Sequence, residues 1–212
     1  MKLNRIKKSL LSLLLMLPIS VWAQTYGIGL RAGVANTSFW GDPESLNRYE
    51  GTRQPLFGVL LYHQSTDRLG FQADVQYARR VVNLHRDGVF EDLNQFRFAL
   101  NYVEVPVSVV VDVLPNRKTA PFLSVGPSVG LLMGARTQAK YVTDENWRED
   151  NEDDSIRKVD LGVEIGTGFR FRTNARMWML DARYHLGVLN LISTSNNPKR
   201  NAGLSLTLGV MF

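Results

Sequence analysis

Apolar and polar residues alternate with a period of two along most of the chain. Such alternation is typical of β-strands, whose successive side chains point to opposite faces of a sheet. Eight segments carry the pattern, at residues 26–34, 55–63, 69–78, 100–113, 120–134, 159–171, 177–187 and 203–212. Beyond the N-terminal region no window approaches the run of about 18 apolar residues that a membrane-spanning helix needs. The pattern therefore predicts an all-β chain.

The connections between these segments alternate in length. Long ones run over residues 35–54, 79–98, 135–157 and 189–201, and short ones lie near residues 65–68, 114–120 and 172–176. Transmembrane barrels produce this alternation, because tight turns gather at one end and long loops at the other. The chain is thus predicted to form an eight-stranded, antiparallel, up-and-down transmembrane β-barrel of the small OmpA/OmpX-like architecture, with both termini on the side of the short turns.

The two faces of the predicted strands differ in charge. One face carries almost no charge, and the other combines many glycines with Arg31, Asp74, Glu104, Asp160, Glu164, Arg170, Asp181 and Arg183. A soluble barrel could turn its apolar face inward, whereas in a membrane the apolar face meets lipid and the charges fill a narrow lumen. We predict the membrane arrangement, with the lumen charges paired in a structural network. A proton or ion path is the functional alternative.

The first residues resemble a cleavable secretory signal. Four basic residues precede an apolar stretch at residues 10–19, and small residues precede a cleavage site between Ala23 and Gln24. The apolar stretch is shorter than the about 20 residues of a spanning helix, which disfavours the alternative of an N-terminal anchor. The predicted division is a signal peptide at residues 1–23 and an outer-membrane barrel domain at residues 24–212.

Composition narrows the possible functions. Removal of residues 1–23 leaves 21 basic against 20 acidic residues, although the full sequence has a net charge of +5. The nearly neutral mature chain has no basic patch that would indicate nucleic acid as a partner. Because the sequence contains no cysteine, it cannot be a lipoprotein anchored through that residue, and it has no disulfides or zinc-thiolate sites. No cofactor and no metal are expected.

The final segment ends on an aromatic residue. Its outward residues Leu208, Val210 and Phe212 are similar to the C-terminal signal that the barrel-assembly machinery recognises. Aromatic residues expected near strand ends or on the outward face would fit interfacial girdles; they are Tyr26, Tyr62, Phe71, Tyr77, Trp178, Tyr184 and Phe212. The last segment therefore predicts both closure of the barrel and its delivery to the outer membrane.

Four strand segments resemble those of a known family. They are "NYVEVPVSV" from Asn101, "APFLSVGPSVGLL" from Ala120, "VDLGVEIGTGFRF" from Val159 and "LSLTLGVMF" from Leu204. Together they resemble the PorT-type outer-membrane barrels of Bacteroidetes-like bacteria. In that family a tyrosine, an acidic residue and a proline recur on the fourth strand, matched here by Tyr102, Glu104 and Pro106. The namesake supports a protein-secretion system, so the resemblance implies such a role at the level of the fold alone.

The acidic run and the histidines give no evidence of a metal site or a catalytic site. Residues 144–154 contain seven acidic residues, and such oxygen ligands bind calcium. This run lacks the glycine and ligand spacing of an EF-hand loop, so we interpret it as a solvated outer loop. The histidines are His63, His85 and His185; His63 shares a face with Ser65, but no aspartate completes a triad. We therefore predict no catalytic residues and a protein that is not an enzyme.

The sequence thus predicts an integral protein of the bacterial outer membrane with periplasmic termini. Its role is expected to be structural or interactive and exercised through the outer loops. An accessory role in protein secretion is the alternative that follows from the resemblance, and a lipid-modifying enzyme or a narrow channel is the third. The expected partners are outer-membrane lipid, the barrel-assembly machinery and a protein at the loops. Nucleic acid is not expected to bind.

Overall fold

The structure, a computed structural model, describes residues 26–40, 47–86, 93–115, 117–141, 147–150, 156–173, 175–191 and 199–212. These residues contain nine strands. The wall of the molecule consists of β1 Tyr26–Trp40, β2 Asn47–Gln64, β3 Leu69–Arg86, β4 Leu93–Asp112, β5 Thr119–Tyr141, β7 Val159–Arg172, β8 Met177–Gly187 and β9 Arg200–Met211. The short strand β6 Trp147–Asp150 pairs with one end of β5. Among the described residues, no helix is long and apolar enough to cross a membrane.

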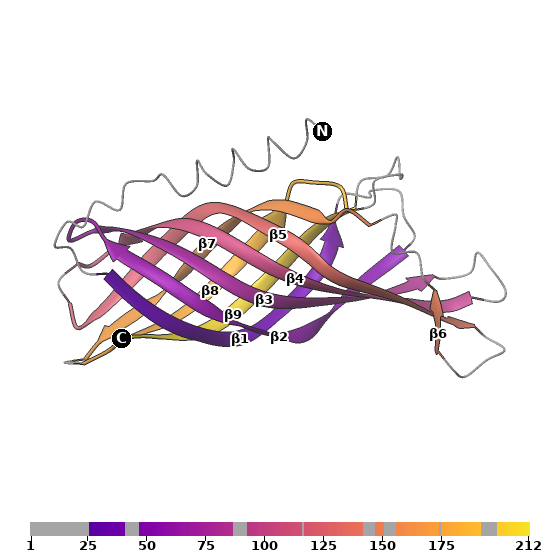
Figure 1. The fold of residues 1–212 in the computed structure, drawn as a ribbon, viewed down its shortest axis with the longest axis horizontal. Coiled ribbons are helices and arrows are strands. Elements are labelled where there is room, and N and C mark those ends of the chain that lie inside the picture. Colours follow the sequence, from indigo (N-terminus) through magenta and orange to yellow (C-terminus); the bar gives the residue numbers. More distant parts are fainter. Residues whose placement is uncertain are drawn as a thin grey trace, which may run out of the picture.

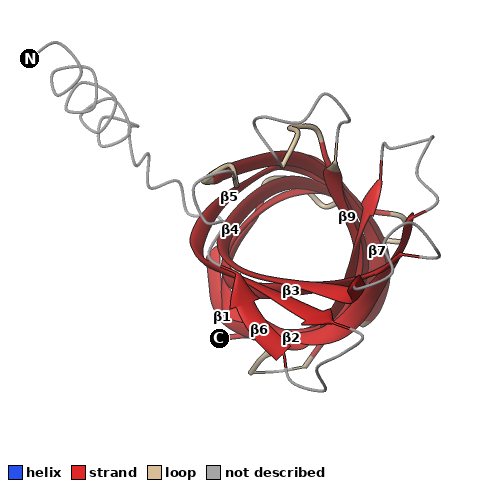
Figure 2. Cartoon of the chain, turned by 90° about the vertical axis from the view of Figure 1, so that its right-hand side faces the viewer, coloured by secondary structure: helices blue, strands red, loops and turns tan. Residues whose placement is uncertain are grey.

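The eight wall strands close into a barrel. Every neighbouring pair is antiparallel, and the ring closes where β1 pairs with β9 and where β4 pairs with β5. Figure 2 looks along the barrel and shows this ring of strands around the lumen. Closure leaves no strand edge exposed to hydrocarbon, where an unpaired backbone group has no partner. The predicted eight-stranded up-and-down barrel is confirmed.

Both ends of the described chain lie at the end of the barrel that carries the short turns (Figure 1). Tyr26 pairs with His63, which is the penultimate residue of β2 before the turn to β3. The backbone amide of Phe212 donates to the carbonyl oxygen of Ile28 at 3.0 Å. We call this end of the barrel the turn end and the opposite one the loop end.

Side chains alternate between the lumen and the outer face. From Val159 to Phe171 the strand β7 switches between exposed and buried at every residue. Its exposed positions are aliphatic or aromatic apart from Thr167, and its buried positions are charged or glycine. Large exposed apolar side chains recur on all eight wall strands. This distribution is the reverse of that in a soluble barrel and suits an outer face in contact with lipid.

Glycines let neighbouring strands and lumen side chains approach closely. At Gly168, a Cβ atom would overlap the carbonyl oxygen of Leu180 and would lie 2.8 Å from Cζ of Phe122. A larger residue at this position would have to displace the backbone of β8. The lumen is therefore narrow, and its own side chains fill it, as expected for eight strands.

The wall is much taller on one side than on the other. Strands β2 to β5 contain 18, 18, 20 and 23 residues, whereas β7, β8 and β9 contain 14, 11 and 12. A tilted strand crosses a bilayer in about 9–11 residues. The longer strands therefore continue beyond the membrane at the loop end, toward the right in Figure 1. We call the loop-end parts of β2 to β5 the raised wall.

The raised wall corrects part of the sequence-based prediction. Residues 35–54, 79–98 and 135–157 were predicted to be long connections, but many of them lie in strands. The acidic run was predicted to be a loop, and its residues 147–150 form β6; the remainder of the run lies outside the described residues. The alternating pattern stops in the raised wall because neither face of a strand must be apolar outside the hydrocarbon. The backbone hydrogen bonds between strands continue there, so the strands do not end.

Candidate functional site

Charged side chains line the lumen. In the described part of the chain the buried charged residues are Arg31, Asp74, Arg80, Glu104, Asp112, Asp160, Glu164, Arg170, Asp181 and Arg183. All eight residues proposed from the sequence for the lumen are in this set. The sequence-based set lacked Arg80 and Asp112.

The first lumen cluster is centred on Arg31 and Arg183. The guanidinium of Arg31 donates to Asp181 at 2.8 Å and pairs with Asp74. Arg183 pairs with the same two carboxylates, at 2.7 Å to Asp74 and 3.1 Å to Asp181, and lies 3.4 Å from Glu164. Because these residues come from β1, β3, β7 and β8, their contacts connect opposite sides of the barrel through its interior.

The second lumen cluster is centred on Arg80 and lies nearer the loop end. The guanidinium donates to Asp160 at 2.7 Å and pairs with Glu104. Asn201 also donates to Asp160, at 2.9 Å, and a ring nitrogen of His185 lies 3.6 Å from the same carboxylate. Buried carboxylates are tolerated only with such partners. The geometry favours a packed network over an ion path.

Apolar clusters lie on both sides of these charges. Toward the turn end the cluster consists of Leu60, Tyr62, Val110, Phe122, Met179 and Met211. Toward the loop end it consists of Leu100, Tyr102, Ile156 and Leu191. Ile156 and Leu191 belong to connections between wall strands, and the amide of Arg157 donates to the carbonyl of Leu191 at 2.8 Å. Within the described residues, apolar side chains thus separate the charged middle of the lumen from both ends.

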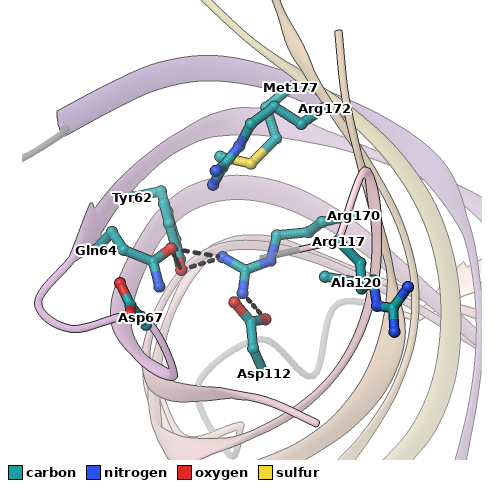
Figure 3. Close-up of a pocket in the computed structure, with 9 residues that line it drawn as sticks. All are labelled: Tyr62, Gln64, Asp67, Asp112, Arg117, Ala120, Arg170, Arg172 and Met177. Atoms are coloured by element: carbon teal, nitrogen blue, oxygen red, sulfur yellow. Dashed lines mark hydrogen bonds and ion pairs between the residues drawn. The ribbon is translucent and has the colours of Figure 1, made fainter. Parts of the chain in front are cut away.

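A cavity of about 340 Å³ opens beside the turn-end apolar cluster (Figure 3). We call it the basic cup; its lining residues are Tyr62, Gln64, Asp67, Asp112, Arg117, Ala120, Arg170, Arg172 and Met177. Arg170 reaches into its centre, where it pairs with Asp112 and donates to the hydroxyl of Tyr62. The guanidinium carbon of Arg170 lies 4.7 Å from the ring centroid of Tyr62 and 5.5 Å from that of Phe122.

The lumen side chains correct one sequence-based assignment and add two residues that the sequence analysis omitted. Tyr62 was expected in an outer aromatic girdle but is only 2% exposed and faces the lumen, because both faces of β2 are apolar and the pattern fixes no register. Arg80 continues the inward positions of β3 and was missed because a connection was expected to begin at residue 79. Asp112 lies on the same inward series of β4 as Tyr102 and Glu104, and that spacing could have revealed it.

The remaining candidate residues lie apart from the lumen or beyond the described residues. His63 is on the outer face, His185 is in the lumen and the side chain of His85 is not described. Leu208 and Phe212 are exposed on the outer face, by 51% and 64%, and Val210 is partly exposed. The signal segment with Ala23 and Gln24 is outside the described residues. The described residues contain no group of three or more histidine, cysteine or acidic residues that could hold a metal ion.

Comparison with protein families gives a match to the model of the outer membrane protein beta-barrel domain, over residues 22–193. The chain belongs to this family. It is an integral β-barrel protein of the bacterial outer membrane, as predicted from the sequence. Neither the family description nor the names of the similar structures below describe an enzyme, and none of them singles out the PorT type. No curated protein matches the chain by sequence.

Among solved structures, the outer-membrane protein OprG from Pseudomonas aeruginosa is similar over 89% of this chain and 97% of its own, with 11% identity and a TM-score of 0.50. Neisserial surface protein A is 13% identical over 87% of this chain and 95% of its own, with a TM-score of 0.45. Ail of Yersinia pestis is 12% identical over 88% of this chain and 98% of its own, with a TM-score of 0.42. At such identities the likeness concerns the fold alone.

Proposed function

We propose that this outer-membrane barrel is neither a channel nor an enzyme and that it presents the raised wall to a protein partner outside the cell. The difference in strand length carries the proposal, because β5 has 23 residues whereas β8 has 11. At about 3.3 Å per residue, β5 is roughly 76 Å long. A bilayer crossing needs about 9–11 strand residues, so about half of β5 is not required for anchoring.

The packed lumen supports the absence of conduction. A continuous file of water would have to pass both apolar clusters and displace the ion pairs of Arg31 and Arg80. Breaking such buried pairs without replacement is costly. Purified protein in planar bilayers is expected to give no unitary conductance steps. Regular conductance steps that occur with the protein and are missing from protein-free bilayers would contradict this part of the proposal.

Photo-crosslinking in intact cells tests the partner. A photoreactive residue is placed at Arg136, which is exposed on β5 beyond the last large apolar position Met133, and in a second chain at Leu208 on the outer face. The Arg136 position is expected to give a discrete protein adduct, whereas the Leu208 position is expected to give lipid adducts. The same adducts from both positions would contradict a partner at the raised wall.

The proposal places the turn end and both termini in the periplasm. Because the sequence has no cysteine, single Arg136→Cys and Arg117→Cys chains can be labelled without background. A membrane-impermeant maleimide should label Arg136→Cys on intact cells and Arg117→Cys only after the outer membrane is opened. Reversed labelling would invert the orientation.

Two further partners belong to the same proposal. Outer-membrane lipid would contact the exposed apolar side chains, and the barrel-assembly machinery would recognise the terminal strand with Leu208, Val210 and Phe212. Deletion of Phe212 is expected to lower the amount of assembled barrel more than the amount synthesised. Arg176→Gln, which removes only the guanidinium 5.3 Å from the ring of Phe212, should leave assembly unchanged.

An accessory role in protein secretion, of the PorT type, is the second candidate. The motif residues Tyr102, Glu104 and Pro106 all face the lumen of this barrel, which supports the likeness in the fourth strand. Deleting the gene would then reduce the secreted proteins in the medium while leaving their synthesis intact. Normal secretion would remove this candidate and leave the raised wall with another partner.

A further inference from the structure

We propose that the basic cup binds a ligand that carries a phosphate group, and that Arg117 and Arg172 hold this group. Both side chains are exposed and line the cavity. Neither forms an ion pair with any residue in the described part of the chain. Guanidinium groups bind phosphate oxygens through paired, charge-assisted hydrogen bonds. Two such groups without a carboxylate partner match the charge of about −1.5 to −2 on a phosphate monoester at neutral pH.

Arg170 has a different role from the two exposed arginines. Its charge is compensated by Asp112, and its guanidinium lies against the rings of Tyr62 and Phe122. The hydroxyl of Tyr62 and the guanidinium of Arg170 both contact the side-chain oxygen of Gln64, at 2.7 Å and 3.3 Å. These contacts fix a floor for the cup, so that the ligand group lies above Arg170 and between the exposed arginines.

The size of the cup restricts the ligand. A volume of about 340 Å³ is near the lower limit of about 300–1,000 Å³ for small-molecule sites. Met177 and Ala120 add apolar surface to the lining. A phosphate group with a short organic substituent therefore suits the cup better than a chain of sugars or a peptide. Such a group can come from a free phosphoester or from a phospholipid headgroup at the turn end.

Asp67 limits the affinity for anions. It lines the cup on the side away from Arg117 in Figure 3, and it has no ion-pair partner among the described residues. Its negative charge opposes binding of a phosphate group without contacting the arginines that hold it. The Asp67→Asn chain should therefore bind inorganic phosphate more tightly, by roughly 1.5- to 5-fold.

Methyl NMR of the full barrel in non-ionic detergent tests the site directly. Inorganic phosphate is titrated at low ionic strength while the methyl signals of Met177, which lines the cup, and Met133, which is 67% exposed on β5, are followed. Only Met177 should shift. The Arg117→Gln/Arg172→Gln double variant should weaken binding at least about tenfold, since it removes the charge-assisted contacts. The Arg53→Gln/Arg79→Gln variant loses two exposed arginines on other strands and should bind normally.

Native mass spectrometry from nanodiscs separates the two sources of the phosphate group. If the source is a lipid, the barrel should retain phosphatidic acid, whose headgroup is a phosphate monoester. The double variant should lose this lipid, while the Arg53→Gln/Arg79→Gln variant keeps it. If the source is a free phosphoester, only the phosphate titration should respond to the double variant. The proposal is overturned if the double variant changes neither measurement, or if the Arg53→Gln/Arg79→Gln variant lowers binding equally. Neither result depends on whether the raised wall has a protein partner.

Discussion

The lumen face and the outer face of the barrel distribute charge in opposite ways. Of the seven acidic side chains whose exposure is described, six are buried in the lumen and Asp67 alone is exposed. Ten described basic side chains are exposed, all of them toward the ends of the barrel or on the raised wall. Between the two ends, the outer face carries aliphatic and aromatic residues. The surroundings of each face therefore determine its chemistry, because lipid rejects charge and a narrow lumen tolerates charge only in pairs.

The adjacent residues Arg79 and Arg80 lie on opposite faces of β3. Arg80 is 4% exposed and is the guanidinium that pairs with both Glu104 and Asp160, whereas Arg79 is exposed on the outer face. We expect Arg80→Met to lower the free energy of unfolding by about 3–5 kcal/mol, since it leaves buried carboxylates without a cation. The measurement is urea unfolding of the refolded barrel in lipid vesicles, followed by tryptophan fluorescence.

Two control chains accompany the Arg80 variant. Arg79→Met should change the same free energy by less than about 0.5 kcal/mol, as surface substitutions do. Adding Glu104→Gln and Asp160→Asn to Arg80→Met should recover part of the loss. Equal effects of Arg79→Met and Arg80→Met would show that the two faces do not differ as described.

An arginine placed on the outer face tests whether lipid excludes charge there. Leu206 is 52% exposed between Leu204 and Leu208 on β9. We expect Leu206→Arg to cost about 2–4 kcal/mol, because an arginine near the bilayer midplane is poorly solvated. Leu204→Arg, nearer the loop end, should cost about 0–1 kcal/mol. The same unfolding assay applies, and equal costs at both positions would place the membrane elsewhere on the barrel.

Glycines test how tightly the lumen side is packed. We expect Gly168→Ala to cost about 1–3 kcal/mol, because the added carbon would overlap the Leu180 carbonyl and approach Phe122. At Gly134 the nearest atom to an added Cβ, an amide nitrogen of Asn101, is 3.9 Å away. Gly134→Ala should therefore change stability little. Thermal gel-shift midpoints in detergent would rank the two variants, and a larger loss at Gly134 would contradict the packing described.

The smallest effect is expected at the turn end of the outer face. The Arg176 guanidinium lies 5.3 Å from the ring centroid of Phe212, and such exposed contacts contribute about 0.5–1 kcal/mol. Arg176→Gln should lower the unfolding free energy by no more than this amount. A loss comparable to that of Arg80→Met would mean that the outer contacts matter as much as the lumen pairs.

The candidate sites show where sequence reasoning reaches its limit. The spacing of Asp160, Glu164 and Arg170 along β7 was enough to place them in the lumen, because the strand alternates without interruption. The basic cup has no such signature. Its residues come from β2, the end of β4, the start of β5, two turns and the ends of β7 and β8. Only closure of the barrel brings Arg117 and Arg172 to one cavity.

By itself, the sequence determined the strand number, the up-and-down order and the inward placement of eight charged residues, since all three depend on a period of two and on connection length. Only the tertiary structure decided which acid pairs with which arginine, that Tyr62 faces the lumen, and that β2 to β5 continue beyond the membrane. The physical reason is the same in each case. Pairing across the lumen and strand extension in water depend on closure and backbone hydrogen bonds, which leave no periodic trace in the side chains.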